Sequence, residues 1–90
     1  MTREEIQQKL IEMAAEQAGV PVLQVTPATH FVNDLEFDSL DFVEYSMAVE
    51  DHFKMSVSDE AAETMMTVGA VADYVAEQLK LTPATPAASS

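Results

Sequence analysis

The chain has 90 residues, of which 48% are hydrophobic, two are glycine and four are proline. This length and composition predict one small domain with a compact, mostly helical core and argue against a disordered chain. The 16 acidic and four basic residues give a formal charge of −12, which disfavours nucleic acid as a partner and favours basic proteins.

The chain contains no cysteine, which excludes a disulfide framework, a thiolate zinc site and a catalytic thiol. Any reactive thiol would therefore have to arrive on a prosthetic group. The first ten residues, MTREEIQQKL, lack the apolar core of a signal peptide, and no apolar run approaches the roughly 20 residues that cross a bilayer. We therefore expect a cytoplasmic protein without stable membrane insertion.

A first helix is predicted over residues 3–18. Thr2 and Glu5 have the spacing of a capping box, and Gly19 offers a C-terminal stop. Between them, apolar residues recur at helical spacing: Ile6, Leu10, Met13, Ala14 and Ala18.

A long connection follows at residues 19–35, where Pro21 and Pro27 prevent the helix from continuing. Its apolar residues are too numerous for a solvated linker and predict packing on the core: Val22, Leu23, Val25, Phe31, Val32 and Leu35. Connections of this length are uncommon unless they are functional.

A second helix is predicted over residues 39–53, with Asp38 as its N-cap and Ser39 at its N-terminal end. One face, which we expect to point into the core, carries Phe42, Tyr45, Ser46, Val49 and Phe53. A second apolar stripe consists of Leu40, Val43 and Met47. Acids border that stripe: Asp41, Glu44, Glu50 and Asp51.

The second stripe has two interpretations. Apolar side chains inside a charged rim are typical of a transient docking surface, where the charges accelerate the encounter. Alternatively, a small bundle buries parts of both stripes, and the acids form an ordinary solvated face.

Two further helices complete the prediction, a short one over residues 59–65 and an amphipathic one over residues 68–79. The inward face of the latter is Val68, Val71, Ala72, Val75 and Leu79. The fold class is therefore all-α, a small four-helix bundle with a long loop between helices one and two and a short third helix. Residues 1–81 form the expected domain, and the Pro, Ala, Thr and Ser composition of residues 82–90 predicts a disordered tail.

The motif FDSLD does not indicate catalysis, because it lacks the glycines of a nucleophile elbow and no motif places His30 or His52 as a base. A calcium loop beginning at Asp34 would have Ser39 where glycine is needed and Tyr45 where a bidentate glutamate is needed. We therefore predict neither an enzyme nor a specific metal site, and leave open loose binding of divalent ions by the acids.

The segment FVNDLEFDSLDFVEYSMAVEDHF resembles the carrier segment of acyl carrier proteins. The resemblance extends through SVSDEAAETMMTVGAVADYVAEQL and covers about residues 3–80. Asp38-Ser39-Leu40 alone would be a weak match. The surrounding residues make it specific: Phe31, Leu35, Val43, Glu44, Met47, Ala48, Glu50, Phe53, Thr67, Val68 and Tyr74.

The resemblance implies that a phosphopantetheinyl transferase attaches 4'-phosphopantetheine to Ser39, with Asp38 and Leu40 beside the attachment point. It further implies a monomeric carrier that delivers acyl thioesters to acyl transferases, synthases and reductases of fatty-acid or related lipid and polyketide biosynthesis. Basic patches on these enzymes would recognise the exposed stripe and its acids: Leu40, Asp41, Val43, Glu44, Met47, Glu50 and Asp51.

The chain departs from the family pattern at several positions. Glu36 stands where the family usually has glycine, so a left-handed backbone there would be costly. Phe42, Tyr45 and Ser46 replace smaller or aliphatic residues, and they either narrow an acyl tunnel, line it with hydroxyls or merely repack it. If the hydroxyls lack partners, we expect poorer burial of long saturated chains. The rival function is an acidic interaction module without a prosthetic group, in which Ser39 begins the helix or is phosphorylated.

Overall fold

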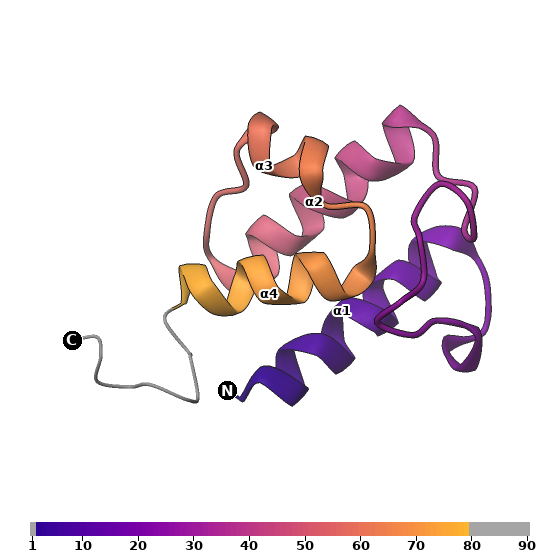
Figure 1. The fold of residues 1–90 in the computed structure, drawn as a ribbon, viewed down its shortest axis with the longest axis horizontal. Coiled ribbons are helices and arrows are strands. Elements are labelled where there is room, and N and C mark those ends of the chain that lie inside the picture. The colour runs from indigo at the N-terminus through magenta and orange to yellow at the C-terminus, as the bar shows by residue number, and fades with distance from the viewer. Residues whose placement is uncertain (1, 80–90) are drawn as a thin grey trace.

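The computed structural model describes residues 2–79, and within this range the chain forms four α-helices and one short 3-10 helix (Figure 1). Their bounds are α1 Arg3–Ala18, η1 Val22–Gln24, α2 Ser39–Phe53, α3 Asp59–Thr64 and α4 Val68–Gln78. The predicted all-α fold with its long first connection and short third helix is confirmed. The domain limit at residue 81 and the predicted tail lie outside the described residues.

Local capping sets the helix boundaries. In α1 the Thr2 hydroxyl accepts from the backbone N–H of Glu5 at 3.1 Å, and the Glu5 carboxylate accepts from the N–H of Thr2 at 2.9 Å. Gly19 ends α1 in the left-handed conformation, with φ at 74°. The third and fourth helices each stop one residue before the predicted end, because Met65 leaves the helical conformation and Leu79 caps α4.

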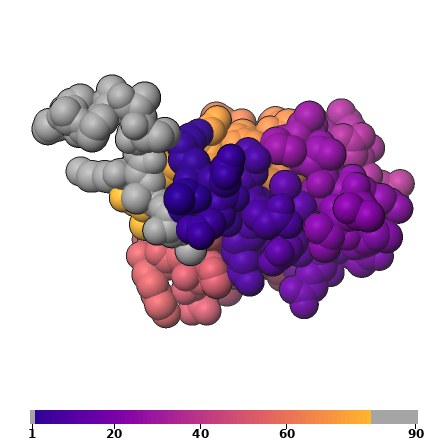
Figure 2. Space-filling model, turned by 90° about the horizontal axis from the view of Figure 1, so that it is seen from below, coloured from indigo at the N-terminus to yellow at the C-terminus, as the bar shows by residue number. Residues whose placement is uncertain are grey.

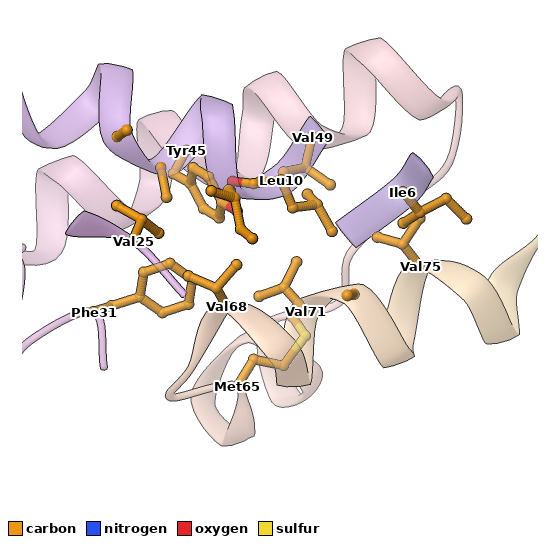
Figure 3. Close-up of a cluster of buried hydrophobic side chains, with 14 of the residues drawn as sticks. Ile6, Leu10, Val25, Phe31, Tyr45, Val49, Met65, Val68, Val71 and Val75 are labelled. Carbon is orange, nitrogen blue, oxygen red and sulfur yellow. The ribbon is translucent and has the colours of Figure 1, made fainter. Parts of the chain in front are cut away.

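The core forms where α1 lies against both α2 and α4. Figure 3 shows side chains from these helices meeting in one cluster, which includes Ile6, Leu10, Tyr45, Val49, Val68, Val71 and Val75. The inward faces predicted for the helices are thus confirmed for these residues. Phe42 and Ser46 are only half-buried, as is Leu79 just beyond α4.

The connection between α1 and α2 is packed on the helices, as predicted. Its backbone is joined to the start of α4, since the N–H of Phe31 donates to the carbonyl of Met66 at 2.9 Å and that of Gly69 to Pro27 at 2.8 Å. A Cβ on Gly69 would lie 2.9 Å from this same carbonyl oxygen, so the close approach requires glycine. Viewed from below, the connection lies beside α1 on one continuous surface (Figure 2).

Three apolar side chains of this connection do not pack as predicted. Leu23 is 96% exposed, and Val22 and Val32 are also exposed, because η1 and the turn after His30 direct their side chains outward. Buried Phe37, which the sequence analysis did not select, joins Val25 and Phe31 in covering the core. Within residues 2–79, no helix is both long enough and apolar enough to cross a membrane.

Tyr45 is buried with its hydroxyl satisfied. The hydroxyl donates to the carbonyl oxygen of Leu10 at 3.0 Å, which joins α2 to α1 (Figure 3). Burial raises the pKa of the Tyr45 phenol far above its ordinary value, because the phenolate would lose its hydration. The folded state therefore requires Tyr45 to be neutral.

Alkali should consequently destabilise the fold through Tyr45. In the unfolded chain the phenol ionises near pH 10, so stability contributed by the neutral phenol is complete below about pH 10 and declines above it. We expect Tyr45→Phe to lose about 1 kcal/mol at pH 7 and to show a flatter decline above pH 10 in denaturant melts. Tyr74→Phe, which removes a half-buried hydroxyl, is the control. Parallel alkaline declines in both variants would exclude Tyr45 as the cause.

Candidate functional site

Ser39 is the first residue of α2 and is exposed. The aspartates on either side of it start the helix. The Asp38 carboxylate accepts from the backbone N–H of Asp41 at 2.8 Å, and the Asp41 carboxylate accepts from the N–H of Asp38 at 3.2 Å. This reciprocal capping box confirms the predicted N-cap and explains why acids flank the serine.

The capping box leaves the first turn of α2 able to receive an anion. It satisfies the N–H groups of Asp38 and Asp41, whereas those of Ser39 and Leu40 lie between them at the positive end of the helix. A phosphate on the Ser39 hydroxyl would thus adjoin two backbone donors. The carboxylates of Asp38 and Asp41 oppose this attraction, but each already accepts a hydrogen bond from the backbone.

A groove of about 740 Å³ opens beside Ser39. Its wall consists of the connection before α2, the first turns of α2 and the region of α3: Phe31, Val32, Phe37, Asp38, Ser39, Phe42, Val43, Asp59, Ala62, Glu63, Met65 and Met66. Apolar side chains predominate, with the acids of α3 on one side. The α3 residues could not be assigned to the site from the sequence, because only the folded chain brings them to Ser39.

A second, much smaller space lies between α2 and the residues that pack against it. The space bounded by Tyr45, Ser46, Val49 and their neighbours measures about 10 Å³, roughly the volume that one water needs. Above it the ring of Phe31 has its centroid 5.3 Å from Phe37, 5.4 Å from Phe42 and 5.1 Å from Tyr45. Phe31, Phe37 and Phe42 also line the groove, while Phe42 and Tyr45 line the small space.

Neither core hydroxyl is left without a partner. The Ser46 hydroxyl donates to the carbonyl of Phe42 at 2.8 Å, and Tyr45 donates to Leu10. The condition under which these hydroxyls would repel a saturated chain is therefore not met. Of the three effects considered for these residues, narrowing by the rings and simple repacking of the core remain.

Glu36 adopts the left-handed conformation, with φ at 59°. The turn closes around it, since its N–H donates to Val32 at 3.1 Å and the N–H of Phe37 donates to Phe31 at 3.0 Å. A left-handed non-glycine residue costs about 1–2 kcal/mol. The approach to Ser39 thus keeps a glycine-like backbone at that cost.

The two histidines have local surroundings that differ from those of a catalytic base. His30 lies in the connection, where its Nδ1 accepts from the backbone N–H groups of Val32 and Asn33 at 3.1 and 3.0 Å. His52 is exposed and stacks edge-to-face on Phe53. Among residues 2–79, no three histidine, aspartate or glutamate side chains gather where they could hold a metal ion.

The second apolar stripe of α2 is exposed, and the alternative that the bundle buries it is wrong. Leu40, Val43 and Met47 are 63%, 51% and 61% exposed. Of the bordering acids, Glu44 and Asp51 are also exposed.

The other two bordering acids, Asp41 and Glu50, are half-buried. The Glu50 carboxylate accepts from the backbone N–H of Val57 at 2.6 Å and so holds the loop before α3. Asp41 takes part in the capping box, so both acids also have roles within the fold.

Comparisons with known proteins match this architecture. A family model described as "Phosphopantetheine attachment site" matches residues 8–75. An acyl carrier protein of Rubrobacter xylanophilus is 49% identical over 77 residues, which are 86% of this chain and 95% of that protein. The solved structure of an acyl carrier protein from Enterococcus faecalis aligns with a TM-score of 0.74 and 37% identity, covering 87% of this chain and 99% of the other.

Proposed function

The chain belongs to the phosphopantetheine-binding family of acyl carrier proteins, and on this premise we propose that Ser39 is the residue that bears the prosthetic group. Members of the family are carriers, and this chain carries acyl intermediates of fatty-acid or related biosynthesis as thioesters on covalently attached 4'-phosphopantetheine. The group supplies the thiol that a chain without cysteine lacks. A phosphopantetheinyl transferase and biosynthetic enzymes are therefore its partners.

The observation that carries the assignment is the position of Ser39. Its exposed hydroxyl stands at the first residue of α2, next to the N–H groups of Ser39 and Leu40 and at the edge of the 740 Å³ groove. The helix start favours the phosphate, and the groove offers an apolar wall to whatever is attached. Asp38 supports the site by beginning the helix at this residue.

The partner surface is proposed to be the exposed part of α2. Leu40, Val43 and Met47 supply apolar contact, while Glu44 and Asp51 attract basic patches on the partner. Asp41 and Glu50 contribute charge to the same surface from fixed, half-buried positions. We further propose a monomer with its carrier domain in residues 1–81, and a cytoplasmic location, which the lack of cysteine favours.

Intact-mass analysis after coexpression with a broad-specificity phosphopantetheinyl transferase tests the attachment residue. We expect the mass to rise by one phosphopantetheine in the parent and in Ser56→Ala, a matched variant at another exposed serine. Ser39→Ala should stay unmodified while retaining the helical circular dichroism of the parent. A loaded Ser39→Ala protein would exclude Ser39. A parent that several competent transferases fail to load would favour the acidic interaction module without a prosthetic group.

A further inference from the structure

Gln17, near the end of α1, connects two acids of α2. Its side-chain Nε2 donates to Oε1 of Glu44 at 2.9 Å and to Oδ1 of Asp41 at 3.4 Å. The two acids lie three residues apart on α2, so their carboxylates repel each other. One half-buried amide therefore holds two like charges side by side where α1 meets α2.

The two acids differ in how many of their carboxylate oxygens accept a hydrogen bond. Both oxygens of Asp41 accept hydrogen bonds, Oδ1 from Gln17 and Oδ2 from the backbone N–H of Asp38. Glu44 is exposed, and the amide occupies its Oε1. Glu44 is thus an exposed carboxylate whose position is fixed from another helix, with Oε2 available to an incoming cation.

We propose that Gln17 is a positioning residue for partner recognition, which holds the Glu44 carboxylate in the place where a basic residue of the partner meets it. The proposal rests on the docking surface described above. A free glutamate on a helix surface samples several rotamers, and a partner that fixes one of them loses affinity through side-chain entropy. An amide that fixes the rotamer beforehand removes that loss.

Gln17 can position the Glu44 carboxylate in this way because its amide is uncharged. A lysine at position 17 would bind the same two carboxylates but cancel part of their charge, and a glutamate would repel them. Glutamine binds both carboxylates without neutralising the negative charge that attracts a basic partner. Gln17→Lys should therefore weaken recognition by a basic partner while it stabilises the fold.

Transferase kinetics with coenzyme A and the apo carrier as substrates provide the test. For Gln17→Ala we expect KM for the carrier to rise about three- to tenfold with kcat unchanged. In a Glu44→Gln background the same replacement should add little, because the positioned charge is already gone. Gln17→Lys should raise KM while raising the melting temperature, which a purely structural role would not produce.

The control is Gln8→Ala, which removes an amide–carboxylate contact to Glu12 within α1, with an N–O distance of 3.5 Å. It should leave KM unchanged. Additive effects of Gln17→Ala and Glu44→Gln, or a KM that follows the melting temperature across the series, would overturn the proposal. Failure of the transferase to load the parent would reject the proposed function itself. A loaded parent with unchanged KM in Gln17→Ala would reject only the role of Gln17.

Discussion

Replacing Glu44 and Asp51 together by lysine should slow association with the phosphopantetheinyl transferase about 10- to 100-fold at low salt. Both side chains are exposed and border the apolar stripe of α2, so their reversal changes the charge that a basic partner meets. Helix content should change little. Stopped-flow association at two ionic strengths should also show a weaker salt dependence, because less attraction remains to be screened.

The control is a double reversal elsewhere, Glu12→Lys with Glu77→Lys, at exposed positions on α1 and α4. Each double variant carries a formal charge of −8 in place of −12, since each replacement adds two units. Equal slowing in both variants would assign the effect to net charge. Unchanged association for every partner tested would remove Glu44 and Asp51 from the recognition surface.

The helices could be predicted because their limits are set by residues close in sequence. Thr2 with Glu5 and Asp38 with Asp41 each form a capping box between residues three positions apart, and Gly19 supplies a left-handed stop. The same locality placed Ser39 at the start of α2. The resemblance of the surrounding segment to acyl carrier proteins, and not this position alone, then implied Ser39 as the attachment residue.

Which of the acids are exposed and which form hydrogen bonds within the fold could not be predicted, because this depends on contacts between residues that are separated in the sequence. Gln17 is 24 and 27 residues from the acids that it holds, and Glu50 binds a backbone N–H seven residues away. In the sequence, Asp41, Glu44, Glu50 and Asp51 form a single group. In the fold, two of them are half-buried and committed to internal hydrogen bonds.

Which apolar side chains of the long connection are buried could not be predicted from the sequence either. Leu23 and Phe37 are both large apolar residues among turn-forming neighbours, yet the first is 96% exposed and the second is 5% exposed. Their positions depend on how the turn at Glu36 and the contacts to α4 orient the chain. Hydrophobicity predicted that this connection packs, but not which of its side chains do so.

The largest expected change in cargo binding follows from Tyr45→Leu. Because the space beside Tyr45 in the parent measures only about 10 Å³, we expect a long saturated chain to remain in the groove beside Ser39. Removing the ring should let such a chain enter between α2 and α4. Burying four more methylenes at about 0.8 kcal/mol each would favour the inserted state about 200-fold.

The measurement compares acyl chains of graded length, attached through the arm, by NMR contacts between the chain and Val49 or Val71 in the core. Two further variants separate the bulk of the Tyr45 ring from the polarity of the hydroxyls as the barrier. Tyr45→Phe removes a hydroxyl but keeps the ring, and Ser46→Val removes the other hydroxyl. Both should stay closed to long chains, since the hydroxyls of Tyr45 and Ser46 already have acceptors. Entry into Tyr45→Phe as deep as into Tyr45→Leu would make the hydroxyl the barrier. Equally deep entry into the parent would mean that the rings only repack the core.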